Sequence, residues 1–593
     1  MSTVTAPADA PTATQTPLKA STALRLWPGL VLLGVLWAAR IMTGIGETSP
    51  TKFFFGLMVT PMAVSVLLLV WWLFASRLRT ADRVMVAAAY VLGIAATIVI
   101  CGQNIPVMAV IFYVLPTLAT VWVGWLALSF PLSWPVRRNL LVTFLIGVCI
   151  YFQLLRLDGM DGNFNATFYW RWTQTSEQKA LAEIGAAPHP QSPTQAVELK
   201  EAPGDWTAFR GPNRDGRLLK GTIATDWTTA PRKVWSHRIG PGWSAYVVVG
   251  NRIFTQEQRD TAEMVVCYDA ETGTEVWSHT ESTRFTEAIG GPGPRATPTF
   301  DNGRLYALGA NGALLCLNAA KGDLVWKRDI TKDAEAKVPV WGFSSSPLIA
   351  HGIVSVYAGG PAGKAVVGYK ADTGDLAWSG GEGQQSYCSP QLSKLNGVEQ
   401  ILFNTDVEMF SLNPVSGAVL WQYKWNTEGA ARVVQPAVVG DSDVLLGTGM
   451  VMGTRRIKLT HDGDSWTPSE VWTCRKFKPY YNDFVQYKDH IYGFGEGGTL
   501  VCVELAQGNL LWKSPGVYGS GQMLLLEEQG LLLVLCEKGD VALVEARAEG
   551  PKEVARFHAL DGKTWNHPVV AHGKLYVRNG EETACFELPG WKE

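Results

Sequence analysis

A glycine followed four residues later by a tryptophan recurs five times between residues 273 and 512. In the clearest copy, residues 268–277, the glycine falls in a short turn between two runs that are typical of β-strands. A two-strand unit that repeats every 40 to 52 residues cannot bury both of its faces, so it must stack against further copies of itself. The pairs are Gly273/Trp277, Gly322/Trp326, Gly374/Trp378, Gly417/Trp421 and Gly508/Trp512.

Trp235, Trp472 and Phe557 continue the series and bring the number of units to eight. Four-stranded sheets of this period, arranged around an axis, form β-propellers of up to about 8 blades. The strand-like runs after Phe557 lack an outer partner, and the Trp235 strand lacks inner ones. We therefore predict an all-β eight-bladed propeller over residues 205–593, closed by the Trp235 strand lying beside the run that ends near Glu587.

The form Asp-x-x-Thr-Gly-x-x-x-Trp, complete at residues 269–277, resembles the repeat of pyrroloquinoline-quinone (PQQ) quinoproteins. It equally resembles their cofactor-free relatives, including the outer-membrane assembly-factor propeller. The lead-in at residues 205–216 resembles the segment that precedes the propeller in bacterial PQQ-like proteins. The resemblance covers residues 203–590 and implies the propeller fold. Within the lead-in, Arg210 and Asp215 are expected to pin a turn against the propeller.

Five apolar runs precede the repeats, at residues 26–43, 54–75, 84–101, 106–130 and 139–156. Most approach the ~20 residues that a bilayer span requires, and none carries a charge near its centre. We predict an α-helical domain of five transmembrane helices over 26–156, a linker over 157–204, and a disordered cytoplasmic tail over 1–25 that is rich in Ala, Thr and Pro. This order of parts resembles that of the membrane-bound quinoprotein glucose dehydrogenase.

Lysines and arginines lie mainly on one side of the predicted bundle. The opposite side holds only Arg40 and Lys52. The positive-inside rule then places the N-terminus in the cytoplasm, and five spans place the propeller outside, on the periplasmic face of a bacterial inner membrane. The residues on the cytoplasmic side are Lys19, Arg25, Arg77, Arg79, Arg83, Arg137 and Arg138.

Composition excludes several classes of partner. A net charge of −2 implies no nucleic-acid surface. All nine histidines follow residue 188, so no haem can be held between histidines of the membrane helices, and no Cys-x-x-Cys-His run exists to attach a c-type haem.

Cys267, Cys316 and Cys502 precede their turn glycines by six residues, which predicts small buried sites rather than disulfides. No adjacent cysteines exist, which argues against the alcohol-oxidising quinoproteins.

A proline near the start of the expected inner strands gives the position of the channel mouth. The residues just before these prolines should ring the mouth, among them Arg295, Tyr387 and Trp565. Trp243, Trp341, Arg432, Asn482, Asp483 and His567 lie close to the corresponding points. The prolines are Pro298, Pro347, Pro390, Pro436 and Pro568.

The resemblance implies roles for these residues if PQQ and Ca²⁺ bind there. Arg295 and Arg432 would meet the carboxylates of the quinone, and Asn482 with Asp483 would supply oxygens to the calcium. Asp483 or His567 would accept a proton from a substrate hydroxyl. Any polar channel mouth offers similar groups. The candidate stacking residues are Trp243, Trp341, Tyr387 and Trp565.

Two functions follow from these patterns. The first is a membrane-anchored extracytoplasmic propeller that binds a periplasmic protein, a glycan or a small ligand. The alternative is an inner-membrane PQQ-dependent dehydrogenase that oxidises a sugar or polyol and reduces membrane quinone. The repeats are closely spaced and leave little room for the loop insertions that build the pocket of the glucose enzyme. This spacing favours the binding module.

Overall fold

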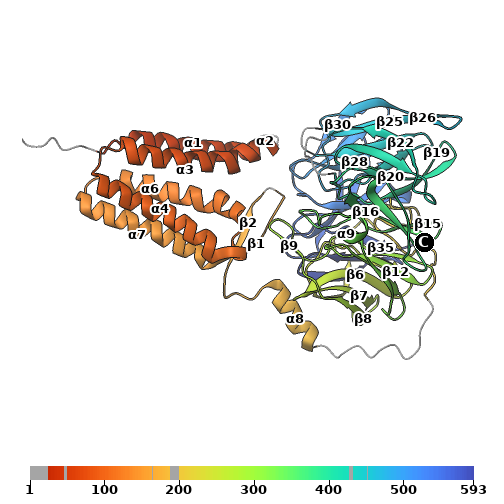
Figure 1. Cartoon of the computed structure of the whole chain (residues 1–593). Coiled ribbons are helices and arrows are strands. Elements are labelled where there is room, and N and C mark those ends of the chain that lie inside the picture. Colours follow the sequence, from red (N-terminus) through yellow and green to blue (C-terminus); the bar gives the residue numbers. More distant parts are fainter. Residues whose placement is uncertain (1–23, 46–49, 163, 187–198, 427–431, 450–451) are drawn as a thin grey trace, which may run out of the picture. The chain divides into compact units, whose positions relative to one another are not determined.

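The computed structural model describes residues 24–45, 50–162, 164–186, 199–426, 432–449 and 452–593 (Figure 1). The predicted tail, residues 1–25, lies outside the described residues except for its last two. The chain divides into a helical unit that ends at Arg156 and a second unit, from Leu157 to Glu593, that contains the propeller.

Four helices of the first unit are long and apolar enough to span a membrane: Phe54–Ala75, Thr80–Cys101, Val107–Leu128 and Trp134–Gln153. The first predicted span forms a shorter helix, α1 (Trp27–Thr43), of 17 residues. At about 1.5 Å per residue it reaches roughly 26 Å, less than the ~30 Å of a bilayer core. The prediction of five transmembrane helices is therefore corrected to four of spanning length.

Two of the four spans contain π-helical turns next to a proline. The first combines η1 (Phe54–Val59), α3 (Thr60–Val70) and η2 (Trp71–Ala75), with Pro61 just after η1. Because proline lacks the N–H of the α-helical ladder and its ring clashes one turn back, the preceding turn widens. The third span repeats this pattern before Pro116 in α5 (Val107–Ala109), η4 (Val110–Val114) and α6 (Leu115–Leu128).

The arginine-bearing ends of two helices are bonded together. Asp82, in α4 (Thr80–Cys101), accepts hydrogen bonds from Arg138 (2.7 Å) and from the indole of Trp134 (2.8 Å), both in α7 (Trp134–Gln153). Since both partners lie in the first turns of their helices, the N-terminal ends of α4 and α7 lie at one end of the bundle.

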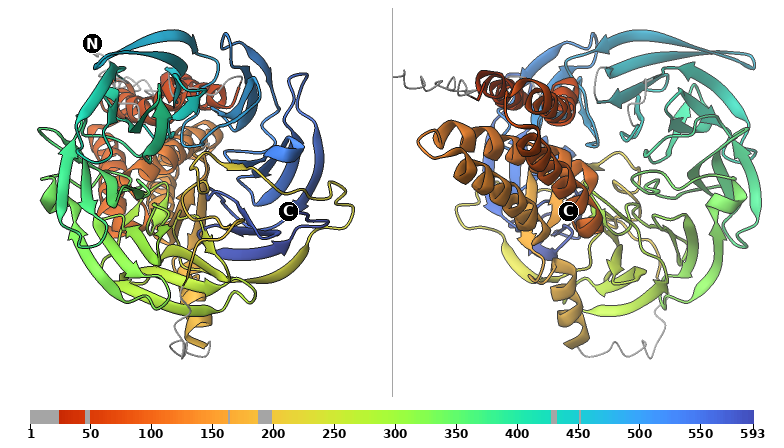
Figure 2. Two further views of the ribbon diagram at one scale, coloured as in Figure 1. Left: turned by 90° about the vertical axis from the view of Figure 1, so that its right-hand side faces the viewer. Right: turned by 60° about the vertical axis from the view of Figure 1, so that its left-hand side comes forward.

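The second unit contains eight blade sheets arranged as a ring (Figure 2). Each blade has four antiparallel strands, and in the blade β31–β34 the short strand β3 (Arg217–Leu218) adds a fifth, parallel to β31. The eight-bladed propeller is confirmed. The first four blades are β5–β8 (Val247–Val249, Arg252–Arg259, Ala262–Asp269, Glu275–Glu281), β11–β14 (Thr299–Asp301, Arg304–Leu308, Ala313–Asn318, Leu324–Asp329), β15–β18 (Leu348–Ala350, Ile353–Gly360, Lys364–Lys370, Leu376–Gly380) and β19–β22 (Gln391–Leu395, Val398–Asn404, Glu408–Leu412, Val419–Lys424). The next three are β23–β26 (Ala437–Val439, Asp443–Thr448, Gly453–Asp462, Ser465–Cys474), β27–β30 (Val485–Tyr487, His490–Gly495, Thr499–Glu504, Leu510–Lys513) and β31–β34 (Gln522–Leu526, Leu531–Leu535, Asp540–Glu545, Glu553–His558).

The last blade is closed by strands from both ends of the domain. It consists of β35 (Val569–Ala571), β36 (Lys574–Arg578), β37 (Glu582–Glu587) and β4 (Arg232–Arg238). Trp235 of β4 is the register partner of Cys585 in β37. The predicted closure is confirmed, and it leaves no open edge in the ring.

The glycine–tryptophan repeat holds neighbouring blades together. Gly322 has φ +78°, and a Cβ on it would lie 2.5 Å from a ring carbon of Trp277 in the preceding blade. The indole N–H of Trp277 donates to the carbonyl of Ala319 in the same turn (3.0 Å). Each turn thus needs glycine both for its backbone conformation and for room under an indole. The other clean copies repeat this contact, as Gly273 on Trp235, Gly374 on Trp326, Gly417 on Trp378 and Gly508 on Trp472.

The small residues opposite the tryptophans have the same cause. Cys267 is the register partner of Trp277, and Gly368 is that of Trp378. A Cβ on Gly368 would lie 2.3 Å from the indole of Trp378. All nine cysteines fall within the described residues, where they are buried and form no disulfide. The structural role predicted for Cys267, Cys316 and Cys502 agrees with this placement.

The expected linker contains regular structure that packs on the propeller. A two-stranded hairpin, β1 (Leu155–Met160) and β2 (Ala166–Trp170), is followed by α8 (Ser176–Ala186). Glu177 of α8 forms an ion pair with Arg284 (2.8 Å), and Ser176 donates to Glu581 (2.7 Å). The later part of the expected linker, residues 187–198, lies outside the described residues.

Candidate ligand-binding pocket

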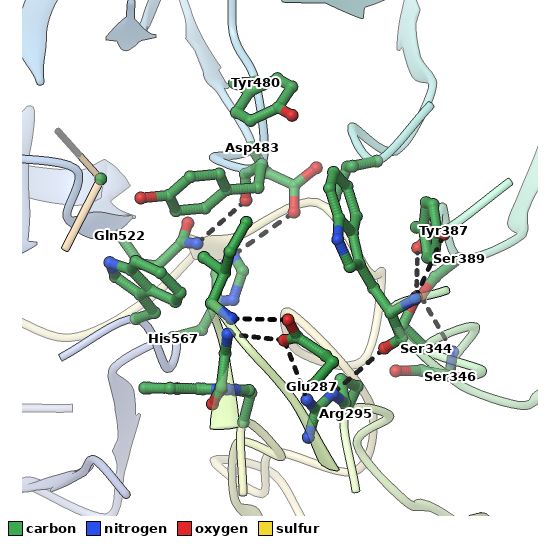
Figure 3. Close-up of a pocket in the computed structure, with 18 of the residues that line it drawn as sticks. Glu287, Arg295, Ser344, Ser346, Tyr387, Ser389, Tyr480, Asp483, Gln522 and His567 are labelled. Atoms are coloured by element: carbon green, nitrogen blue, oxygen red, sulfur yellow. Dashed lines mark hydrogen bonds and ion pairs between the residues drawn. The ribbon is translucent and has the colours of Figure 1, made fainter. Parts of the chain in front are cut away.

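The connections between blades converge on one pocket of about 230 Å³ (Figure 3). Each of the five marker prolines stands one residue before the first strand of a blade, as predicted. The residues before these prolines therefore lie in the segments that enter the inner strands, and Ser344, Ser346, Tyr387, Ser389 and Val433 from these segments line the pocket. Repetition of the blade brings residues that are far apart in sequence to one site.

Eight of the 21 residues that line the pocket are Phe, Tyr or Trp, and we call it the aromatic pocket. The rings of Trp243 and Trp565 lie 5.1 Å apart, and Tyr481 lies 5.0 Å from Trp565. Across the pocket, the rings of Trp341 and Tyr387 lie 4.9 Å apart. Phe164 and Phe209 also contribute. Such a lining offers flat apolar faces on which a ring or an extended side chain can stack.

Arg295 is the arginine of the lining, and most of its donors are already bonded. Its guanidinium donates to the backbone carbonyls of Trp341 (3.2 Å), Gly291 (2.7 Å) and Gly293, and to Glu287 (3.2 Å). The side chain is 8% exposed. Burial lowers the pKa of Arg295 to about 10 against the opposing effect of Glu287, so it stays charged at neutral pH.

Lys563 lies behind the aromatic wall. Its ammonium lies 4.2 Å from the ring centre of Trp565 and 5.2 Å from that of Trp243. It donates to the carbonyls of Ile289 (2.8 Å) and Met160 (3.0 Å). Burial lowers the pKa of Lys563 to about 8. This lysine therefore ties the β1–β2 hairpin to the blade connections.

The tip of the hairpin forms part of the pocket wall. The N–H of Gly162 donates to Glu537 Oε1 (2.8 Å), and Asp161, Gly162 and Phe164 line the pocket. A Cβ on Gly162 would lie 2.6 Å from Ser520 Oγ. The fit at this point leaves no room for a side chain.

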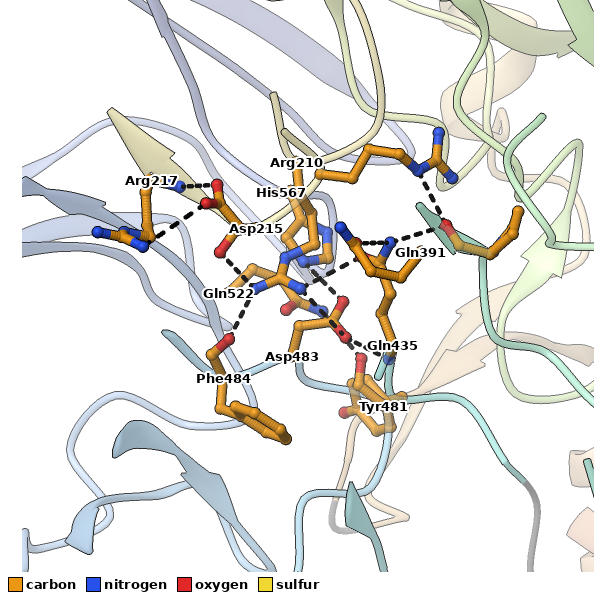
Figure 4. Close-up of polar contacts among 12 residues, drawn as sticks. Arg210, Asp215, Arg217, Gln391, Gln435, Tyr481, Asp483, Phe484, Gln522 and His567 are labelled. Carbon is orange, nitrogen blue, oxygen red and sulfur yellow. Dashed lines mark hydrogen bonds and ion pairs between the residues drawn. The ribbon is translucent and has the colours of Figure 1, made fainter. Parts of the chain in front are cut away.

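Asp483 and His567 form a buried pair at the base of the pocket (Figures 3 and 4). His567 Nε2 lies 3.3 Å from Asp483 Oδ2 without the alignment of a hydrogen bond. Asp483 accepts from the N–H of Gln435 (2.8 Å), and Arg210 lies 3.8 Å away. Burial favours the neutral acid, but the positive charge of Arg210 opposes it, and the pKa of Asp483 is lowered. Burial lowers the pKa of His567, which is therefore neutral at neutral pH.

Seven of the nine predicted site residues line this pocket: Trp243, Arg295, Trp341, Tyr387, Asp483, Trp565 and His567. Arg432 and Asn482 do not. Arg432 is buried elsewhere, where it donates to the carbonyls of Thr405 (3.0 Å) and Trp425, and Asn482 donates to Gly521 O (2.5 Å). In each case the next residue, Val433 or Asp483, faces the pocket instead. Neighbouring residues of an extended segment point to opposite sides, which explains both differences.

Four charged groups at the site were not predicted: Asp161, Glu287, Glu537 and Lys563. Glu287 belongs to β9 (Thr286–Glu287), which pairs with β10 (Gly291–Pro292) in the connection between the first two blades. No repeat marks that insertion in the sequence. Lys563 lies two residues before Trp565 in a segment that was predicted, but its sequence position alone did not distinguish it from a surface lysine.

The donor set does not fit PQQ with calcium. A tricarboxylated quinone needs cations, whereas the lining holds the carboxylates of Asp161, Glu287 and Asp483 against the single guanidinium of Arg295. Among the residues that the structure describes, no three His, Cys, Asp or Glu side chains converge as a metal-ligand cluster. The aromatic faces would suit a planar ring, but its charge would be repelled.

The comparisons with known proteins agree with the repeat pattern. The family model described as outer membrane protein assembly factor BamB matches residues 261–514. The chain carries PQQ-like propeller repeats. BamB of Alteromonas naphthalenivorans is 25% identical over 259 residues, which are 40% of this chain and 59% of the relative. BamB of Yersinia pestis is 23% identical over 295 residues, 46% of this chain and 70% of the relative. The chain thus spans 59% of the length of the first of these relatives.

Two solved structures match parts of the chain at low identity. BamB from Moraxella catarrhalis is 14% identical with a TM-score of 0.44, and the match covers 62% of this chain and 98% of that one. Quinohemoprotein alcohol dehydrogenase from Comamonas testosteroni is 12% identical with a TM-score of 0.46, covering 70% and 85% of the two chains.

Proposed function

We propose that the chain is a membrane-anchored propeller that binds a partner protein or a small ligand in the aromatic pocket. The observation that carries this proposal is which groups of the pocket are already bonded within the protein and which are not. The donors of Arg295 are largely bonded within the protein, whereas the indole and phenol faces of the lining remain for a ligand. A site of this kind binds by stacking and by a few hydrogen bonds.

We expect the part of the ligand that enters the aromatic pocket to be neutral or positively charged. Three carboxylates face one guanidinium in the lining, and the carboxamide oxygen Oε1 of Gln522 is buried without a hydrogen-bond partner among the described residues. That oxygen, like the carboxylates, accepts hydrogen bonds from a ligand that donates them. A sugar ring or a lysine or arginine side chain of a partner loop has both a stacking face and donors. The similarity to proteins named as outer membrane protein assembly factors supports a protein partner.

The propeller is proposed to lie outside the cytoplasm of a bacterial cell membrane. Arg77 and Arg79 lie between the first two helices of spanning length, and Arg137 and Arg138 lie in the first turn of the last one. The positive-inside rule places those ends in the cytoplasm, so the chain leaves α7 on the outer side. This placement follows from the four spans alone. Whether α1 also crosses the membrane decides only the side on which the N-terminus lies.

A ligand titration of the full chain in detergent tests the pocket. Tryptophan fluorescence is followed against a panel of oligosaccharides and of arginine- and lysine-containing peptides. We expect a saturable change with a member of the panel that is lost in Trp565→Ala and kept in Trp172→Ala, whose side chain is 68% exposed and outside the pocket. No saturable response to any member, or equal responses from both variants, would refute the assignment.

The dehydrogenase is the second candidate, and one observation favours it. Asp483 and His567, the residues predicted as bases, lie 3.3 Å apart in the same pocket as the aromatic faces. Addition of PQQ and Ca²⁺, followed by visible spectroscopy and dye reduction with a panel of sugars and polyols, decides between the two functions. Turnover by the wild type that is lost in His567→Gln would favour the dehydrogenase over the binding module.

A further inference from the structure

The lead-in fills the centre of the ring with two buried arginines. Arg210 and Arg214 have φ values of +62° and +57°, and they are 4% and 3% exposed. Arg214 donates to three backbone carbonyls, those of Ser346 (2.9 Å), Pro347 (2.9 Å) and Pro390 (3.0 Å). These carbonyls come from segments that enter two inner strands, so the arginine joins neighbouring blades.

Arg210 makes a similar set of contacts (Figure 4). It donates to the carbonyls of Phe484 (2.6 Å) and Asp215 (3.1 Å) and to the side-chain oxygen of Gln435 (3.3 Å). The expected pinning of the turn by Arg210 and Asp215 therefore runs through the backbone of Asp215. The Nε of Arg210 is buried and has no acceptor among the described residues.

The charge of Arg214 is not balanced by a carboxylate. Arg210 faces Asp483 at 3.8 Å, but no described carboxylate lies within 4 Å of Arg214. Burial, and then the neighbouring charge of Arg210, lower the pKa of Arg214 to about 9, so it is still a cation at neutral pH. A buried cation without a counter-ion is costly, and carbonyl dipoles offset only part of that cost.

A cavity of about 250 Å³ adjoins these arginines. Its lining includes the cations Arg210, Arg214, Arg217 and Lys394, with Asp215 as the carboxylate among them. Arg217 is already paired with Glu527, to which its Nε donates at 2.8 Å. Lys394 is exposed, and no described carboxylate lies within 4 Å of it. Arg214 and Lys394 thus give this cavity an excess of positive charge.

We propose that this cavity, the anion pocket, binds a phosphate or carboxylate group of a small molecule. The anion would lie between the guanidinium of Arg214 and the ammonium of Lys394. It would accept hydrogen bonds from those N–H groups of the arginines that have no partner within the protein. Guanidinium groups match the geometry of both oxyanions. The proposal goes beyond the aromatic pocket and does not depend on its ligand.

Isothermal titration of the full chain in detergent tests the proposal with inorganic phosphate and with citrate, at an ionic strength held constant with chloride. We expect saturable binding of one or both, and the one that binds identifies the oxyanion. Lys394→Gln should weaken that binding about five-fold, the effect of losing an exposed charge partner. The matched control, Lys321→Gln, changes an exposed lysine on a blade turn outside the anion pocket and should leave the affinity unchanged.

A second readout covers the buried arginine, because Arg214→Gln can lower stability for structural reasons alone. The melting temperature of the wild type should rise with phosphate or citrate concentration beyond the chloride control. In Arg214→Gln that dependence on the anion should be lost, whatever the starting melting temperature. Absence of saturable binding by the wild type, or equal affinities of the wild type and Lys394→Gln, would overturn the proposal.

Discussion

A single methyl group on a blade turn tests the packing of the ring. In Gly322→Ala the added Cβ would meet the indole of Trp277 at 2.5 Å on a backbone with φ +78°. Gly397 is a matched control, because it has φ +80° and nothing within 4 Å of its Cβ position. The two substitutions share the backbone strain and differ in the contact with the neighbouring blade.

The expected losses follow from these two terms. Alanine in a left-handed conformation costs roughly 1–2 kcal/mol, which is the whole effect expected for Gly397→Ala. Overpacking against a rigid indole costs about 1–3 kcal/mol more. Gly322→Ala should therefore lower the free energy of unfolding by roughly 2–5 kcal/mol.

Denaturant unfolding of the full chain in detergent, followed by circular dichroism in the β-sheet region, gives both free energies. The difference between the two variants is the quantity of interest, since it removes the common strain. Equal losses in Gly322→Ala and Gly397→Ala would refute the view that the repeat glycine exists to admit the indole of the preceding blade.

Three further substitutions have defined outcomes. Burial raises the pKa of Glu263 from 4.5 to about 7. The free energy of unfolding of the wild type should therefore fall as the pH rises from 4.5 to 7, by at most about 3 kcal/mol. Glu263→Gln should remove this dependence on pH in unfolding measured at about pH 4.5 and about pH 7.5. Burial lowers the pKa of Lys563 from 10.5 to about 8, so stability should rise between pH 8 and 10, and Lys563→Met should lose that rise. Trp235→Ala, in the closing strand, should cost about 3–5 kcal/mol in denaturant unfolding, whereas exposed Trp172→Ala should cost little.

The architecture of the propeller could be predicted because its cause is local and repeated. Each glycine–tryptophan pair marks one blade, and the unpaired strands at the two ends of the series require closure by β4 and β37. In the helical unit, the end of the first helix could not be predicted from the sequence. An apolar run from residue 26 to 43 does not show that its helix stops at Thr43, short of the length of the other four.

The pocket could be predicted only to the level of the segment. The marker prolines locate the connections that enter the inner strands, and seven of the nine predicted side chains line one pocket. The sequence does not show which residues of an extended segment face the pocket, and for this reason it predicts Arg432 where the structure has Val433. The hairpin tip at Gly162 lies outside the repeats altogether, and no pattern connects it with Glu537.

The channel holds two pockets of opposite charge along the same inner strands. Asp483 lines the aromatic pocket, and Phe484, the next residue, lines the anion pocket. Arg210 stands between them, since it lines the anion pocket and lies 3.8 Å from Asp483. A tricarboxylated quinone should therefore prefer the anion pocket over the aromatic one. If phosphate displaces PQQ and Lys394→Gln weakens its binding, PQQ is bound in the anion pocket, and this binding would not support a dehydrogenase. If only Trp565→Ala removes the binding, PQQ is bound in the aromatic pocket, and this result would support the dehydrogenase.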